Sequence, residues 1–240
     1  MYQLEKIKKI KNLVHGISTK TDGNMSFNWG LKEEVIKNRK KFLKTLRVNP
    51  KKCIVMQLEH KNRILDVVQR FAGRGILQTD APVADCLITK EKNLFLFLLT
   101  ADCLPIIFFD PSKKTLALAH LGWKNTDTKF CQNIIKKLKK LGSDPKNIIV
   151  GIGPGIHKES YIKGRDIPKW KKFVRKVDEK KFQINLIGYN KQQLLDSGVP
   201  ETNIEISPIN TVKSKNFFSH YYAKKTGKKE ARFATIVGML

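Results

Sequence analysis

Short apolar runs, each ending at a turn, recur along the chain and predict a series of buried β-strands. The two strongest runs, 93–100 and 104–110, are rich in Phe, Leu and Ile, as is typical of strands that are buried on both faces. Weaker strand patterns cover six further segments: 53–58, 63–68, 83–89, 115–120, 147–152 and 232–240.

Helical periodicity is confined to fewer segments, namely 38–46, 126–141, 169–177 and 191–197. In 126–141 the apolar residues share one face, lysines fill the other, and Gly142 is a suitable C-terminal stop. Strands outnumber helices and do not alternate with them regularly. We therefore expect an α+β fold, with residues 1–240 forming a single domain of mixed β-sheets flanked by helices.

The hydropathy of the chain argues against membrane insertion. The longest apolar runs, 94–99 and 104–109, have six residues each, which is far too short to cross a bilayer. The basic N-terminus lacks the uninterrupted apolar core of a signal peptide. We therefore expect a cytoplasmic protein that has no contact with a membrane.

The net charge of +26 suggests a nucleic-acid partner at first sight, since 47 basic residues outnumber 21 acidic ones. However, 39 of those basic residues are lysines, whereas arginine is preferred for bidentate recognition of bases and phosphates. The lysines also extend from Lys6 to Lys229 without forming one basic arm. We expect no nucleic-acid partner, although the charge can steer anionic substrates toward the protein.

Two reactive residues stand at matching ends of neighbouring strand patterns. Cys103 precedes the run 104–110 and His120 ends the run 115–120, with a polar turn at 110–112 between them. If the strands pair as a hairpin, the two residues lie roughly opposite each other. This arrangement predicts a contact between Cys103 and His120, either as a catalytic Cys–His pair or as two ligands of one metal ion.

His60, which follows another apolar run, is a candidate third ligand. Two imidazoles and one thiolate leave a tetrahedral position open, which is typical of catalytic rather than structural zinc sites. Asp102 adjoins Cys103 and is a candidate to orient a ligand or to act as a general base. The turn at Gly122-Trp123 offers backbone N–H groups that suit a phosphate.

Spacing alone leaves simpler interpretations open. Gaps of 43 and 17 residues between His60, Cys103 and His120 match no metal-binding signature. A cysteine in an apolar strand is commonly an inert core residue, and a histidine at a strand end commonly makes a structural hydrogen bond.

Longer motifs extend these observations. Five segments stand out, in this order: HGISTKTDG, QLEH, TADCLPIIFFDP, LALAHLGWKNT and GIGPGI. Together they resemble the multicopper polyphenol oxidoreductase, or laccase-domain, family. The members of that family are now regarded as purine nucleoside phosphorylases. The resemblance covers nearly the whole chain, and the order of the TADC and H-x-G-W motifs is specific. It implies a fold like that of the catalytic domain of cytotoxic necrotizing factor.

The resemblance also implies a function. It implies that His60, Cys103 and His120 bind zinc, with copper as the other candidate metal. The expected reaction is phosphorolysis of adenosine, inosine and methylthioadenosine to a free base and ribose 1-phosphate, with adenosine deamination as a side activity. The alternatives are a copper-dependent polyphenol oxidase and a metal-free Cys–His hydrolase.

Substrate binding is expected from four residues near the motifs: Lys20, Trp123, Lys124 and Arg232. Lys20 and Lys124 stand where the family usually has arginine, which keeps the charge but loses the bidentate fork. Gly155 replaces a cysteine that is usual in the family. These departures concern anion binding and substrate preference, and the three candidate metal ligands are intact.

Overall fold

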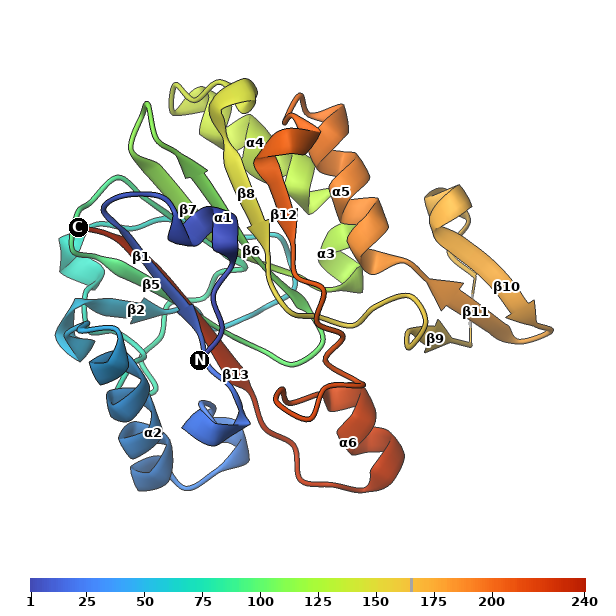
Figure 1. The fold of residues 1–240 in the computed structure, drawn as a ribbon, viewed down its shortest axis with the longest axis horizontal. Helices are drawn as coiled ribbons and strands as arrows, with labels where there is room; N and C mark the ends of the chain where they lie inside the picture. The colour runs from blue at the N-terminus through green and yellow to red at the C-terminus, as the bar shows by residue number, and fades with distance from the viewer. Residues whose placement is uncertain (165) are drawn as a thin grey trace.

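Two large β-sheets, described here from a computed structural model, form the centre of the molecule (Figure 1). The structure describes residues 1–164 and 166–240. The first sheet has the order β1 (Leu13–Ile17), β13 (Phe233–Met239), β5 (Phe95–Thr100), β2 (Cys53–Val55). The second has the order β12 (Ile204–Ile206), β8 (Ile149–Ile152), β6 (Leu104–Asp110), β7 (Thr115–Leu121), β4 (Cys86–Thr89), β3 (Ile64–Asp66). Both sheets mix parallel and antiparallel pairs.

The two sheets pack face to face around one apolar cluster. On β7, Leu116 and Leu118 belong to the cluster between the sheets, whereas Ala117 and Ala119 belong to a cluster on the opposite face. Strand β5 alternates in the same way, because a strand directs successive side chains to opposite faces. Both central strands are therefore buried on both faces, and this is why their sequences are continuously apolar.

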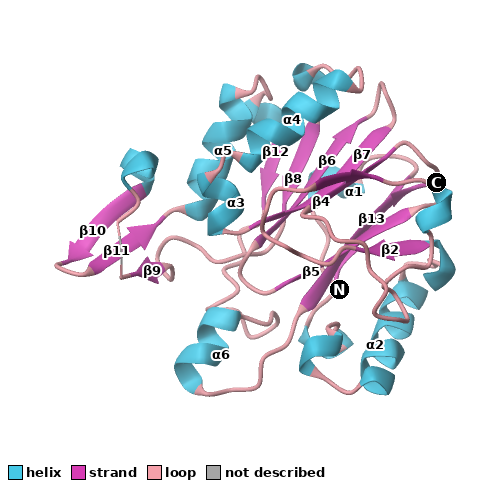
Figure 2. Ribbon diagram, turned by 180° about the vertical axis from the view of Figure 1, so that it is seen from behind, coloured by secondary structure: helices cyan, strands magenta, loops and turns pink. Residues whose placement is uncertain are grey.

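Helices cover the two outer faces (Figure 2). Helices α4 (Phe130–Lys140) and α5 (Leu186–Asp196) pack on the six-stranded sheet, and α2 (Lys32–Thr45) packs on the four-stranded sheet. The predicted α+β architecture of mixed sheets flanked by helices is confirmed. The single-domain expectation stays a prediction.

Three predicted helices have different bounds in the structure. The helix predicted at 38–46 is α2, which begins six residues earlier, at Lys32. The predicted helix at 126–141 consists of two helices, α3 (Trp123–Asp127) and α4. They are separated at Lys129, whose φ of 56° lies in the left-handed region and cannot continue a helix. The helix predicted at 191–197 is α5, which begins five residues earlier at Leu186.

The helix predicted at 169–177 is wrong. Residues Pro168–Phe173 form 3-10 turns, and Val174–Asp178 form strand β10, which pairs with β11 (Lys181–Ile184). Together with β9 (Ile162–Lys163), these strands make a small third sheet beside the main body (Figure 1). The apolar residues of this segment fit a helical spacing, but strand pairing with a later segment satisfies the backbone hydrogen bonds instead.

Several elements have no counterpart among the sequence predictions. They include β1, β9, β11, β12, the short helix α1 (Glu5–Lys8) and helix α6 (His220–Thr226). Across the described ranges 1–164 and 166–240, every helix is too short or too polar to pass through a lipid bilayer.

The β6–β7 hairpin that carries the reactive residues is confirmed, with a shift in register. Pro105, rather than Cys103, lies opposite His120. Asp110 fixes the turn, because its Oδ1 accepts hydrogen bonds from the Ser112 backbone (2.9 Å) and hydroxyl (2.7 Å) and from the Lys113 backbone (3.1 Å). The turn therefore sets how β6 and β7 align at the other end of the hairpin.

We expect Asp110→Asn to lower the free energy of unfolding by about 1–2 kcal/mol at neutral pH, because the turn loses charge-assisted hydrogen bonds. Burial of Asp110 raises its pKa, but hydrogen bonds from Ser112 and Lys113 lower it more, so the folded pKa lies below the usual 3.8. This stabilisation is therefore fully present above the unfolded pKa and is lost as the pH falls through the folded pKa. Urea unfolding of both proteins from neutral to acidic pH should show the difference narrowing; a constant difference would contradict this assignment.

Candidate active site

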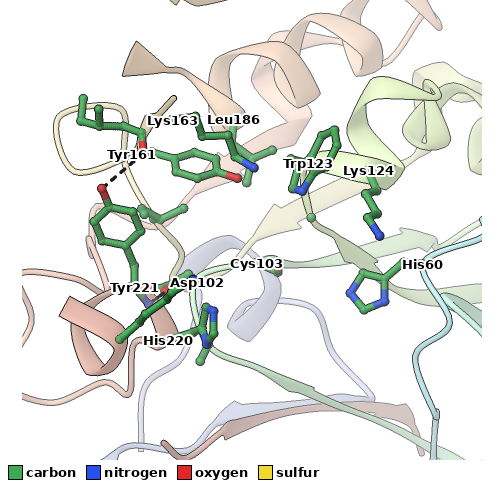
Figure 3. A pocket seen from close by; sticks show the side chains of 15 residues that line it. His60, Asp102, Cys103, Trp123, Lys124, Tyr161, Lys163, Leu186, His220 and Tyr221 are labelled. Atoms are coloured by element: carbon green, nitrogen blue, oxygen red, sulfur yellow. Dashed lines mark hydrogen bonds between the residues drawn. The ribbon is translucent and has the colours of Figure 1, made fainter. Parts of the chain in front are cut away.

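A cavity of about 580 Å³ lies where the ends of β6 and β7 meet the small third sheet and helix α6. His60, Asp102, Cys103 and Gly122 line one part of it. Aromatic and cationic side chains line the remainder (Figure 3): Trp123, Lys124, Tyr161, Lys163, His220, Tyr221 and Lys224. Two of the three sequence-predicted donors, His60 and Cys103, therefore face the same space as rings and positive charges.

Cys103 is held by a tight connection between β5 and β6. Asp102 precedes it with a φ of 82°, a left-handed conformation that is uncommon for a residue other than glycine. The buried Asp102 carboxylate accepts hydrogen bonds from the Thr211 hydroxyl and the Tyr221 backbone N–H, both at 2.6 Å. Its carbonyl oxygen accepts the Ile156 N–H at 2.8 Å. Because both carboxylate oxygens already have donors, this geometry favours a positioning role for Asp102.

His120 lies behind the cavity wall, at the end of β7, and is 2% exposed. Gly122 separates it from Cys103: a Cβ on this glycine would lie 2.9 Å from Cys103 Sγ and 3.7 Å from His120 Nε2. The absence of a side chain at Gly122 therefore lets the thiol and the imidazole approach the same point. The structure brings these two predicted residues together.

His60 joins them from a separate loop, and its ring centroid is 4.9 Å from that of His120 at an interplanar angle of 82°. Its φ of 63° is also left-handed. The buried carboxylate of Asp85 holds this loop by accepting backbone N–H bonds from His60 and Lys61, both at 2.8 Å, and from Arg63 at 3.3 Å. The Asp85 carbonyl oxygen accepts the His120 N–H at 2.8 Å. One residue therefore positions both histidines.

The thiol and the buried imidazole are uncharged in the chain itself. Burial, with a further contribution from Asp102, raises the pKa of Cys103 to about 12, although Arg232 and Lys163 oppose the shift. Burial, and then the neighbouring His60, lowers the pKa of His120 to about 3. At neutral pH these values disfavour the thiolate–imidazolium pair that a metal-free thiol hydrolase requires.

The fit of a metal ion to these residues depends on chemistry and on geometry. Two imidazoles and one thiol are a donor set that zinc prefers, and buried His120 Nδ1 has no hydrogen-bond partner among the residues that the structure describes. However, within residues 1–164 and 166–240, no group of three His, Cys, Asp or Glu side chains forms an arrangement that could hold a metal ion. The donor types and the space at Gly122 therefore fit zinc, while a closed ligand geometry is not formed.

The predicted substrate-binding residues are divided among three cavities. Trp123 and Lys124 line the cavity with Cys103. Arg232 lines a second cavity that shares only His60 with the first, and its guanidinium lies 5.2 Å from the centre of the Trp29 ring. Lys20 lines a third cavity without any of the predicted donors.

Sequence reasoning missed most of the cavity wall opposite His60. Lys163 belongs to β9 of the small third sheet and Tyr161 lies just before that strand, with Lys163 Nζ 4.3 Å from the centre of the Trp123 ring. Three more residues come from α6, where the motif His220-Tyr221-Tyr222 beside two lysines was an available signal. His220 Nδ1 lies 2.6 Å from Glu230 Oε1, which places a hydrogen-bonded imidazole at the cavity.

Comparison with known proteins identifies the family of this chain and a solved structure with the same fold. The sequence pattern of the multi-copper polyphenol oxidoreductase laccase family matches residues 14–239. Purine nucleoside phosphorylase YlmD of Bacillus subtilis is 30% identical, over 95% of this chain and 89% of the relative. Adenosine deaminase RL5, from an unknown prokaryotic organism, is 26% identical, over 73% of this chain and 71% of the relative. The crystal structure of YlmD from Geobacillus stearothermophilus superposes with a TM-score of 0.90 at 26% identity, covering 98% of this chain and 93% of that one.

We expect Asp85→Asn to destabilise the fold by about 2–4 kcal/mol, because the new amide places N–H groups against backbone N–H groups in a buried site. The His60 loop should loosen more than the sheet, which hydrogen exchange of residues 59–63 would reveal. Asp66→Asn is a matched control, since Asp66 is half-exposed and pairs with Lys137 at the surface. Equal protection of the loop in both variants would contradict the positioning role of Asp85.

Proposed function

Because the chain belongs to the multi-copper polyphenol oxidoreductase laccase family, we propose that it is a zinc-dependent purine nucleoside phosphorylase. The observation that supports this most is the composition of the first cavity, in which metal-type donors, aromatic rings and lysines face the same space. Rings suit a purine, and lysines suit phosphate. Relatives named purine nucleoside phosphorylase and adenosine deaminase give independent support for chemistry on purine nucleosides.

The proposed substrates are adenosine, inosine and methylthioadenosine together with phosphate. Trp123, Tyr161 and Tyr221 offer ring faces and edges against which a purine can stack. Lys124, Lys163 and Lys224 add positive potential from two sides of the cavity, which neutralises phosphate as it approaches the nucleoside. The products are a free base and ribose 1-phosphate.

In the reaction, a phosphate oxygen forms a bond to the ribose C1′ while the bond from C1′ to the purine nitrogen breaks. The electron pair of the broken bond remains on the base, which then takes up a proton. His220 lines the cavity and is held by Glu230, so it is our candidate to hand that proton to the base. Bound zinc, held by His60, Cys103 and His120, would supply Lewis-acid polarisation of a substrate oxygen.

The relative named Adenosine deaminase RL5 supports a side activity in which adenosine loses its amino group. The same purine-binding rings would serve this reaction, in which water attacks the purine carbon that carries the amino group and ammonia leaves, whereas in phosphorolysis phosphate attacks the ribose C1′.

The first experiment tests metal dependence. We expect purified protein to contain about one zinc per chain and to release hypoxanthine from inosine only when phosphate is present. Cys103→Ala should lose both the metal and the activity, whereas Cys53→Ala, which removes another buried thiol, should retain both. Elemental analysis and chromatography of the base provide the readouts.

Other outcomes of this experiment distinguish the alternatives. Phenol oxidation that requires added copper, without cleavage of nucleosides, would favour the polyphenol oxidase. Hydrolytic activity that survives chelation but not Cys103→Ala would favour the metal-free thiol hydrolase.

The second experiment tests the proton donor. His220→Gln keeps a polar side chain but cannot exchange a proton, so we expect kcat for inosine to fall by about 10²-fold with a much smaller change in KM. The zinc content of the variant should be unchanged. A fall in zinc content, or a change in KM alone, would assign His220 to structure or binding rather than to proton transfer.

A further inference from the structure

A third cavity, lined by five lysines, lies on the other side of helix α6 from the candidate active site. Its volume is about 580 Å³, and no carboxylate of the described residues lines it. The lysines are Lys20, Lys213, Lys215, Lys228 and Lys229. We propose that this cavity binds a compact polyanion that carries a di- or triphosphate group.

The acidic groups closest in sequence are directed elsewhere. Glu230 follows Lys229 directly, but its carboxylate contacts His220 and Arg232 at 2.6 and 2.8 Å. Asp22 accepts the backbone N–H of Thr19 at 2.8 Å and lies 3.6 Å from the N-terminal ammonium. Among the described residues no carboxylate lines the cavity, and Glu159, whose charge interacts with that of Lys213, lies outside its lining.

None of the five lysines forms an ion pair within 4.0 Å in the part of the chain that the structure describes. Their mutual repulsion is reduced by solvent and salt but is removed only by a counter-charge. A single phosphate would compensate one or two ammonium groups, whereas a di- or triphosphate matches the number of lysines better. The charge count thus favours a polyanion over inorganic phosphate.

The cavity is also shaped by fixed backbone contacts, so its lysines do not all come from one mobile segment. Lys20 donates its backbone N–H to the Asn216 carbonyl at 2.8 Å, which ties the Lys20 turn to the loop carrying Lys213 and Lys215. Ser214 and Ser219 add hydroxyl groups to the lining. Tyr222 contributes a ring that is 37% exposed, with Lys228 Nζ 5.4 Å from its centre. A phosphate chain and an attached aromatic base both have suitable partners here.

Helix α6 separates this cavity from the candidate active site. Tyr222 and Ala223 line the lysine cavity, whereas His220, Tyr221 and Lys224 line the other. The two cavities are therefore distinct but share helix α6 as a wall. The proposed polyanion binding does not depend on the reaction proposed for the candidate active site.

The experiment is a calorimetric titration of the full chain with inorganic triphosphate and, separately, with ATP, at about 150 mM salt, where exposed charges are largely screened beyond about 8 Å. We expect binding of triphosphate that weakens at least about tenfold in the triple variant Lys215→Gln, Lys228→Gln, Lys229→Gln. The matched control removes three exposed lysines from α2: Lys40→Gln, Lys41→Gln and Lys44→Gln. It should bind triphosphate with nearly wild-type affinity.

The outcomes distinguish a phosphate chain from a nucleotide as the ligand, and binding in the lysine cavity from binding elsewhere. Equal affinity for triphosphate and ATP identifies the phosphate chain as the ligand, and tighter binding of ATP identifies a nucleotide. No binding, or equal weakening in both triple variants, would overturn the proposal, because the second result reflects net charge alone. Binding lost in Lys124→Gln but kept in the cavity variant would place the anion in the candidate active site and would also overturn it. Thermal unfolding of each variant checks that the fold is intact.

Discussion

The buried carboxylate of Asp85 is the interaction on which the candidate site depends. It fixes the His60 loop through three backbone N–H groups, while its own carbonyl oxygen holds the backbone of His120. The carboxylate of Asp102 has a similar role beside Cys103, because its hydrogen bonds connect the Cys103 turn to Thr211 and to helix α6. These two carboxylates connect loops from distant parts of the sequence to the rigid edge of the six-stranded sheet, which is how the donor side chains meet.

The positive φ angles of His60 and Asp102 show that bringing the donor side chains together costs conformational free energy in the backbone. A left-handed conformation is unfavourable for residues with a Cβ by roughly 1–2 kcal/mol, so each must be held by surrounding contacts. In both cases the holding contacts are short backbone hydrogen bonds to a carboxylate. The strain is therefore stored next to the reactive side chains and is balanced by buried ionic hydrogen bonds.

The parts of the fold that could be predicted from the sequence are those whose signals are local. The apolar runs of β5 and β6 and the turn at Asp110 predict buried strands and a hairpin, and the hairpin brings Cys103 near His120. Helix α6 and the small third sheet carry no comparable hydrophobic pattern, because their positions are set by long-range contacts such as that of Tyr221 with Asp102. Lys163, Lys224, Tyr161 and Tyr221 were missed for this reason, whereas the predicted Lys124 does line the cavity. Lys20 and Arg232 line two other cavities, and their role in substrate binding stays a prediction.

The charge distribution around Cys103 helps to distinguish the two activities for which the family and its members are named, oxidation of polyphenols and phosphorolysis of purine nucleosides. The positive charges of Lys124, Lys163 and Lys224 around the cavity would contribute little to the binding of a neutral phenol. In phosphorolysis, by contrast, they would attract the phosphate dianion into the cavity. The buried thiol is also affected, since Lys163 and Arg232 partly oppose the rise in its pKa. The same positive field would favour both an anionic co-substrate and the deprotonated sulfur that a zinc ion requires, so the proposed metal binding and the proposed phosphate binding would depend on one physical property of the cavity.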